Sequence, residues 1–177
     1  MSDKHIIWER IEDSSIRDIA YRMGRAPRWA GATEEWWSVL DHSLFCEALS
    51  RKYLPDYPEY NFHCLVHDCH EFASADVPKP FVCDCLTDIQ TDIDYIIFTK
   101  YNFPHRTPDI KKHVDHIDWV AREIERESLL HQLVDFPEEF SHFLDRSPLE
   151  TIYRSGRIVD IFVKKVNMYL KMFGNKI

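Results

Sequence analysis

The sequence predicts an all-α protein with a single domain spanning residues 1–177. Three observations lead to this prediction. A chain of 177 residues, 45% hydrophobic and 14% aromatic, can bury one substantial core. The chain contains only 4 glycines, and apolar residues recur at helical spacing over long stretches. We see no repeat, low-complexity tract or linker that would divide it.

The expected helices follow one another through short connections. Asp13 and Ser14 can cap a first helix that ends near Met23, and a loop follows from Gly24 to Thr33. Ser38 can cap the second helix. This second helix is predicted to run to about residue 52, and later helices are predicted at 60–73, 84–102, 110–131 and 148–173, with some strand character left open at 93–98.

Charge and composition exclude several classes of function. A formal net charge of -8 argues against a nucleic-acid polymer as the main partner, although a metal and a few cations can still hold a small anion. The 5 cysteines are an odd number and favour reduced thiols over a disulfide framework or a cysteine-based zinc site. Neither a signal peptide nor an apolar run of ~18–20 residues is present, so we expect a cytoplasmic protein without a membrane partner.

The adjacent pair His67 and Asp68 is the first candidate for metal binding. On a helix over 60–73, these two residues and Glu71 lie opposite an apolar stripe that includes Phe62 and Cys69. One imidazole and one carboxylate can serve the same divalent ion. The alternative for this helix alone is a solvated polar face.

Two further helices supply the remaining ligand candidates. His42 lies among apolar neighbours, which predicts a buried imidazole that is either a satisfied core histidine or a ligand. Asp118 borders the apolar stripe of its helix, whereas Asp115 points towards solvent. The alternative for Asp118 is an ion pair with Arg122. Together, the four residues predict a site for Mn, Co, Fe or Zn.

Three blocks of sequence carry a family resemblance. RWAGATEEWWSVLDHS ends in a histidine after an aromatic-rich stretch, LVHDCHEFASADVPKP contains the His-Asp pair, and VDHIDWVAREIERESLL places an Asp seven residues before Glu125. In these blocks the chain resembles the HD-domain phosphohydrolase superfamily. The resemblance is closest to the branch of bacterial 5′-deoxynucleotidases and phage HD phosphohydrolases, which includes phage dATP triphosphohydrolases. It covers most of residues 14–130.

The resemblance implies roles for individual residues. His42, His67, Asp68 and Asp118 would bind one divalent ion, and Glu71 matches the family's catalytic glutamate. A carboxylate there could orient the attacking water or accept its proton.

A second group of residues would contact the substrate. Asp76 would accept a hydrogen bond from the deoxyribose 3′-hydroxyl, and Arg28 matches a phosphate-binding arginine. Trp29 and Pro80 are candidates for packing against the nucleoside, Gly31 for close approach of a base, and Lys79 for outer phosphates. The plainer alternatives are a core aromatic for Trp29, a turn former for Asp76 and an exposed turn lysine for Lys79.

Two residues depart from the family pattern. Ala75 stands where the family usually has glycine, and Ala32 stands where many phage members have histidine. Four other histidines, His63, His70, His113 and His116, lie at helix-surface angles, and we expect them to be solvated.

The expected function is hydrolysis of the 5′-phosphoester of a 2′-deoxynucleotide by water attack at the α-phosphorus. A monophosphate would yield phosphate, whereas a dNTP would yield triphosphate and would bring a second ion such as Mg. The alternative from another class is a regulatory module that binds nucleotides. The resemblance also implies a homo-oligomer, and a location in the host cytoplasm if the chain is encoded by a phage.

Overall fold

The computed structural model describes residues 8–9, 11–134 and 157–174, and these residues form an all-α fold. The predicted fold class is therefore confirmed for the described part of the chain. Its helices are α2 (Ile16–Met23), η1 (Arg28–Gly31), α3 (Val39–Tyr53), α4 (Pro58–Val66), α5 (Glu71–Ser74), η2 (Lys79–Phe81), α6 (Asp84–Lys100), α7 (Pro108–Leu129) and α9 (Ile158–Gly174).

Polar side chains cap the helices that build the site. Ser38 begins α3 as predicted, and its hydroxyl accepts a hydrogen bond from the backbone N–H of Asp41 while the Asp41 carboxylate accepts from the Ser38 N–H. Thr107 caps α7, and Pro108 occupies the first helical position. The cap of α2 is Ser15 and not the predicted Asp13 or Ser14, because Ser15 is the residue that forms a capping box with Asp18.

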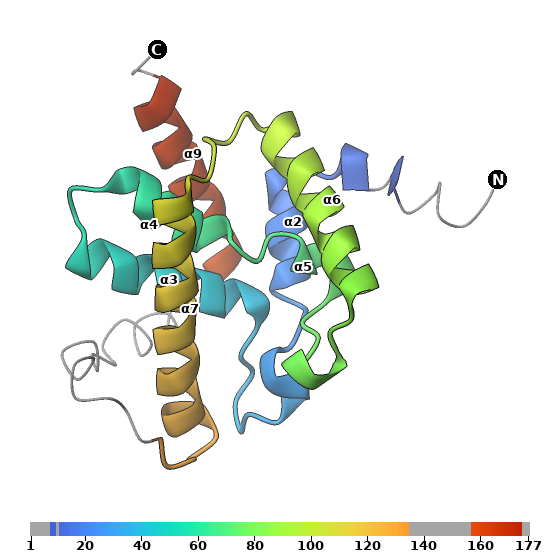
Figure 1. The fold of residues 1–177 in the computed structure, drawn as a ribbon, viewed down its shortest axis with the longest axis vertical. Coiled ribbons are helices and arrows are strands. Elements are labelled where there is room, and N and C mark those ends of the chain that lie inside the picture. Colours follow the sequence, from blue (N-terminus) through green and yellow to red (C-terminus); the bar gives the residue numbers. More distant parts are fainter. Residues whose placement is uncertain (1–7, 10, 135–156, 175–177) are drawn as a thin grey trace.

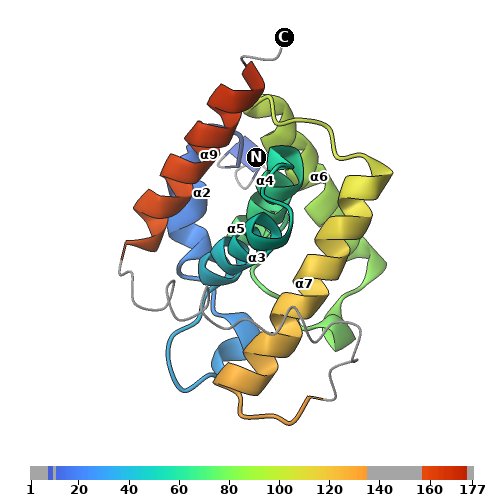
Figure 2. The same ribbon diagram turned by 90° about the vertical axis from the view of Figure 1, so that its left-hand side faces the viewer.

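The helices form two groups around a central pair. Figure 2 shows α3 and α4 in the middle, with α2 and α9 on one side and α7 on the other. In Figure 1, α7 crosses in front of this pair, and α6 contacts the short helix α5. The two central helices therefore contribute to both halves of the core and can present residues towards α7.

The core explains why these helices assemble. The apolar stripe predicted for α7 is buried against α3 and α4, and its members are Ile110, Val114, Ile117, Ala121 and Ile124. A second cluster fills the space between α2, α9 and the central helices and includes Ile19, Leu44, Phe62 and Phe162. Burial of a large apolar side chain contributes about 1.5–3 kcal/mol, so these stripes fix the direction of each helix.

A buried carboxylate attaches the C-terminal helix to α3. Glu47 is 0% exposed and accepts hydrogen bonds from Lys165 at 2.8 Å and from the Tyr169 hydroxyl at 2.7 Å. Because an unpaired buried charge is costly, these contacts fix the position of α9. Residues 148–157 of the predicted last helix lie outside its observed span, and 148–156 are outside the described residues.

The predicted helix over 60–73 is interrupted. The α-helix ends at Val66, and over the next residues the backbone N–H groups bond three residues back, from Cys69 to Val66 and from Glu71 to Asp68. This tighter winding places side chains three residues apart on one side. The prediction of a continuous helix was wrong here, and the interruption changes which side chains lie together.

Three other parts of the chain can be compared with the sequence prediction. The predicted loop from Gly24 to Thr33 contains a 3-10 turn, and the segment 93–98 is helical with no strand character. His63 was expected to be solvated but is 0% exposed, because its ring stacks on Phe98 of α6 and lies near His105 and Arg106. Among the described helices, none combines the length and apolar character needed to cross a bilayer.

Candidate metal centre

Four side chains from three segments converge at one point. The Nε2 atom of His42 on α3 lies 3.1 Å from an Asp118 oxygen on α7 and 3.7 Å from an Asp68 oxygen. The Nε2 atom of His67 lies 3.1 Å from the same Asp68 oxygen and 3.9 Å from the same Asp118 oxygen. Two ligands held about 2.1 Å from a common ion are separated by roughly 3.0–3.4 Å when adjacent. Two of the four spacings, both 3.1 Å, lie in this range, and those of 3.7 Å and 3.9 Å are below the ~4.2 Å between opposite ligands, so the four groups can surround one divalent ion.

Hydrogen bonds orient both imidazoles. The Nδ1 atom of His42 lies 2.6 Å from a carboxylate oxygen of Glu125, and that of His67 lies 2.9 Å from the carbonyl oxygen of Cys64. These oxygens can only accept, so each Nδ1 carries the hydrogen, and each neutral ring keeps its lone pair on Nε2.

The His67 Nε2 atom is buried and has no hydrogen-bond partner. A lone pair that faces carboxylate oxygens is repelled unless a proton or a cation lies between them. The donor set is therefore suited to a positive ion.

Without an ion, the pKa values of these four residues are set by burial and by the charges of their neighbours. Burial acts to lower the pKa of His67, but the neighbouring Asp68 and Asp118 outweigh it and raise the pKa to about 10. The pKa of His42 is also raised, since Glu125 and Asp118 outweigh burial and the nearby Arg28. Burial acts to raise the pKa of Asp68 and Asp118, but the histidines lower both. Without an ion, the site attracts protons.

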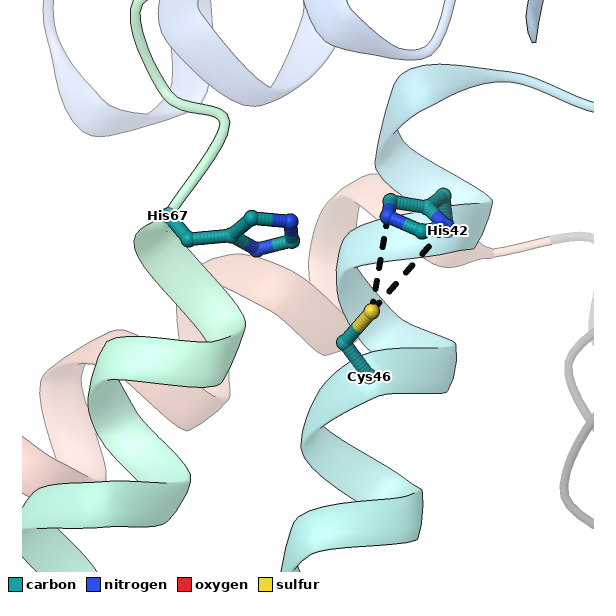
Figure 3. Close-up of side chains that lie close together, drawn as sticks. All are labelled: His42, Cys46 and His67. Carbon is teal, nitrogen blue, oxygen red and sulfur yellow. Dashed lines mark hydrogen bonds between the residues drawn. The ribbon is translucent and has the colours of Figure 1, made fainter. Parts of the chain in front are cut away.

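A thiol that sequence reasoning did not assign to the site lies beside these rings. Figure 3 shows Cys46 one turn from His42, with the His67 ring pointing towards His42. The Cys46 sulfur is 3.4 Å from Nε2 and 4.0 Å from Nδ1 of His42, so it lies near both ring nitrogens. Burial raises the pKa of the Cys46 thiol well above its ordinary value. The group is therefore protonated at neutral pH, and a ligand sulfur must be a thiolate.

Arg28 is buried between two carboxylates of the centre. It is 6% exposed, and its guanidinium nitrogens lie 3.6 Å from Asp68 and 3.6 Å from Glu125. Burial acts to lower the pKa of Arg28, but these carboxylates raise it, so the side chain stays charged. A permanently charged guanidinium group next to a candidate metal-ligand carboxylate is suited to binding a phosphate oxygen.

The turn after Arg28 has an unusual backbone. Trp29 and Ala30 have φ angles of 56° and 52°, and Gly31 follows at 77°. Left-handed residues with a Cβ are strained, and this strain is compensated by contacts of Trp29. Its N–H donates to Asp76 at 3.3 Å, and its indole N–H donates to Glu125 at 3.1 Å. The turn therefore joins the metal centre to the Asp76 loop.

A cavity of about 640 Å³ opens beside the metal centre. Its lining contains most of the candidates predicted from sequence, namely Arg28, Trp29, Asp68, Glu71, Asp76, Pro80 and Asp118. His42 and His67 are buried beneath it, and Gly31 is exposed and not among the lining residues. The side chain of Lys79 lies outside the described residues.

Sequence reasoning missed several polar residues of the lining. These are His70, Gln90, Arg122, Glu123 and Arg126. The helical spacing of Arg122 and Arg126, four and eight residues after Asp118, was the available signal. His70 was expected to be solvated, but the interruption after α4 places it at the cavity and 3.2 Å from Asp94.

Glu71 differs in charge state from the other carboxyl groups. It is 9% exposed, and one of its oxygens is buried without a hydrogen-bond partner. Burial, together with the charges of Asp68 and Asp76, raises the pKa of Glu71 to about 10. A carboxyl group that holds a proton at neutral pH is suited to acid–base chemistry.

Comparison with known proteins places the chain in a family. No family model matches it. It is 31% identical over 133 residues to a protein of Escherichia coli (strain K12) named Uncharacterized protein YfdR, and the match covers 72% of this chain and 69% of that protein. This similarity extends over most of both sequences, and the chain therefore belongs to the same family as YfdR.

Proposed function

We propose that this chain is an HD-domain, metal-dependent phosphohydrolase that cleaves the 5′-phosphoester of 2′-deoxynucleotides. The observation that carries the proposal is the convergence of His42, His67, Asp68 and Asp118, with His67 Nε2 left without a hydrogen-bond partner. Without an ion, this buried nitrogen can face the two carboxylates only by taking up a proton, so the position favours positive charge. The adjoining cavity supplies space for a small-molecule substrate.

The ion and Arg28 would both bind the phosphate group, each with its own role. A divalent ion supplies Lewis-acid polarisation and lowers the pKa of a bound water. Nitrogen and oxygen ligands accept Mn, Co, Zn or Fe. Arg28 is held in place by Asp68 and Glu125 and lines the cavity, so it would bind a phosphate oxygen without needing to reorganise.

Glu71 is the proposed acid–base group. It lies in the cavity lining, three residues beyond Asp68, and its raised pKa makes it a stronger base than an exposed glutamate. A divalent ion bound next to Glu71 would favour its ionised form, and the carboxylate would then accept a proton from the attacking water. That proton would then be available to the departing 5′-oxygen of the nucleoside.

The nucleoside would occupy the end of the cavity formed by the turn and the Asp76 loop. Trp29 and Pro80 both line this end and offer apolar surface to a sugar or base. The Trp29 N–H holds one oxygen of Asp76, so the other oxygen would accept a hydrogen bond from a 3′-hydroxyl.

One observation favours a dNTP triphosphohydrolase as the second candidate. Arg122 and Arg126 follow the metal ligand Asp118 at intervals of one helical turn, and all three line the cavity. A helix rises about 6 Å over four residues. The arginines thus extend away from the ion over a length that the β- and γ-phosphates of a triphosphate would need.

A nucleotide panel tests the proposal. The chain is stripped of metal, reloaded separately with Mn, Co, Zn or Fe, and incubated with dAMP, dATP, AMP or ATP while phosphate, pyrophosphate and triphosphate are resolved. We expect metal-dependent release of phosphate from dAMP, or of triphosphate from dATP, with slower turnover of the ribonucleotides. Asp118→Asn should abolish turnover, whereas Asp115→Asn, on the exposed side of α7, should preserve it. Nucleotide binding without turnover for every metal would instead indicate a regulatory module.

A further inference from the structure

Two exposed cysteines lie at the start of α6 and take no part in the chemistry proposed above. The chain contains 5 cysteines, and three of them are buried, whereas Cys83 and Cys85 are exposed. The two residues before the pair are open to solvent as well, since Phe81 is 76% exposed and Val82 is 41% exposed. Small molecules in solution can therefore reach both thiols.

The backbone at the start of α6 holds the two sulfur atoms close together. Cys83 is the extended N-cap residue of α6, with φ -114° and ψ 162°, and Asp84 is the first helical residue. Cα atoms two residues apart in a helix are separated by roughly 5.4 Å. Disulfides usually join Cα atoms roughly 4.4–6.8 Å apart. A bond between Cys83 and Cys85 therefore requires the side chains to move but does not require α6 to unwind.

The two thiols differ in acidity. The Cys85 thiol donates a hydrogen bond to Cys83, and the backbone N–H of Leu86 also favours the thiolate, so the pKa of Cys83 is lowered. The same contact raises the pKa of Cys85, which keeps its proton. Because the thiolate is the nucleophile, Cys83 is the group that attacks and Cys85 is the group that reacts second. Burial instead raises the pKa of the other three thiols, Cys46, Cys64 and Cys69.

The pair is connected to the cavity wall on both sides. Val82 directly precedes Cys83 and lines the cavity, as does Pro80. Further along α6, Gln90 also lines the cavity, and its amide donates a hydrogen bond to the Ser74 hydroxyl at 3.2 Å. A movement of Cys83 would therefore be passed to residues that we propose to pack against the nucleoside.

We propose that Cys83 and Cys85 form a redox site that reacts with low-molecular-weight disulfides and whose oxidation changes the shape of the adjoining cavity. The Cys83 thiolate attacks one sulfur of the small disulfide, the S–S bond of that molecule breaks, and the first small thiol leaves as a mixed disulfide forms. The Cys85 thiol then loses its proton and attacks the Cys83 sulfur, and the second small thiol leaves. Two electrons pass from the cysteine pair to the small disulfide, and the two thiol protons of the pair end on the two small thiols.

Oxidation should weaken the binding of substrate. The new bond draws the Cys83 sulfur towards Cys85 and moves Val82 with it, so the nucleoside loses part of its apolar wall. This consequence rests on the proposed function. Since small displacements of positioning groups have large kinetic effects, we expect the KM for dAMP to rise about tenfold. The kcat should change little, because the four metal-ligand candidates lie outside this segment.

Equilibration of the full chain in buffers of reduced and oxidised glutathione tests the site without relying on activity. Remaining thiols are alkylated, and the intact mass and the cross-linked peptide are measured. We expect the oxidised wild type to lose two hydrogen atoms in mass, to link Cys83 to Cys85, and to recover both thiols in dithiothreitol. Hydrogen exchange of the backbone over 77–86 should slow in the oxidised form, because the bond restricts opening of this segment.

Serine variants separate the roles of the two thiols, and serine is close to cysteine in size. Cys85→Ser should stop at a mixed disulfide between glutathione and Cys83, whereas Cys83→Ser should react more slowly. The double variant Cys83→Ser, Cys85→Ser is the matched control, and its three buried thiols should stay reduced in every buffer.

The inference is overturned if the wild-type pair stays reduced in excess oxidised glutathione, or if it links two chains instead of closing within one. It is also overturned if exchange over 77–86 or the KM for dAMP is the same in both redox states. Hydrolysis of a nucleotide by a chain whose pair cannot be oxidised would overturn this inference alone. A reversible disulfide with slowed exchange, but without hydrolysis of any nucleotide in either state, would overturn the proposed function alone.

Discussion

The Nδ1 atom of His42 lies 2.6 Å from a carboxylate oxygen of Glu125, a residue two helical turns beyond Asp118 on α7. One helix therefore provides both a ligand carboxylate and the group that orients a ligand imidazole. Both Glu125 and His42 are 0% exposed, and Trp29 and Arg28 contact the second oxygen of Glu125. This contact links the metal centre to the turn that carries the phosphate-binding candidate.

Glu125→Gln is expected to weaken metal binding. The amide keeps the shape of the side chain but loses the negative charge that fixes the His42 hydrogen on Nδ1 and supports the basicity of Nε2. We expect the affinity for Mn²⁺ or Zn²⁺ to fall about 10- to 100-fold, as measured by calorimetry. The exposed carboxylate Asp115 provides a control, and Asp115→Asn should leave the affinity unchanged. Equal affinities for wild type and Glu125→Gln would remove Glu125 from the support of the centre.

Metal affinity should increase with pH. Carboxylates raise the pKa of His67 to about 10, so its ring binds an additional proton at neutral pH when no ion is present, and they also raise the pKa of His42. An ion must displace this proton, and raising the pH removes the competition. We expect the Mn²⁺ association constant to rise by at least about tenfold per pH unit between pH 6 and 8, the slope for one released proton. An affinity that does not change over this range would contradict the proton exchange.

Glu71→Gln should lower turnover by ~10²-fold or more, because the amide cannot accept a proton. Binding of the ion held by His42, His67, Asp68 and Asp118 should persist, since Glu71 is not among those ligands. Steady-state kinetics on dAMP and dATP, with metal content measured on the same samples, checks both expectations. A rate within twofold of wild type would exclude acid–base catalysis by this residue.

Arg126→Ala should affect a triphosphate more than a monophosphate. Arg126 lies two turns from Asp118 and is the last residue of α7 that lines the cavity, so the outer phosphates of a triphosphate would come closer to it than a monophosphate at the ion. If dATP is a substrate, we expect its kcat/KM to fall about tenfold or more while that of dAMP changes less than twofold. The existing contacts of Arg126 with Glu123 would be lost in either case. An equal effect on both substrates would indicate a structural role for Arg126.

Ala75→Gly should stabilise the protein. Ala75 has φ 61° and ψ 169°, a conformation that is essentially restricted to glycine, and it stands where the resembled family usually has glycine. Relief of this strain should raise the free energy of unfolding by about 1–3 kcal/mol in chemical denaturation. Ala73→Gly, within the short helix α5, should instead destabilise by about 0.5–1 kcal/mol. A loss of stability in Ala75→Gly would show that the local backbone is not strained as observed.

How far the sequence could predict the site depended on the type of pattern. The 3.6-residue periodicity of α7 was sufficient to select Asp118 over Asp115, because the apolar stripe fixes which side of a helix faces the core. The apolar neighbours of His42 on its own helix likewise predicted its burial, and the serine before that helix predicted the Ser38 cap. The same assumption of regular winding was wrong for 60–73, where i→i−3 hydrogen bonds change the angular spacing of side chains.

The sequence by itself determined the all-α class, the main helices and their inward faces, because apolar periodicity and capping are local properties of the chain. Only the tertiary structure decided that Glu125 orients His42, that Arg28 lies between two carboxylates, and that His70 faces the cavity beside Asp94. These relationships join residues 24–97 positions apart, and they depend on how α3, α6 and α7 pack and on the strained turn at Trp29. Local patterns contain no information on such distances, since packing between elements is set by the whole core.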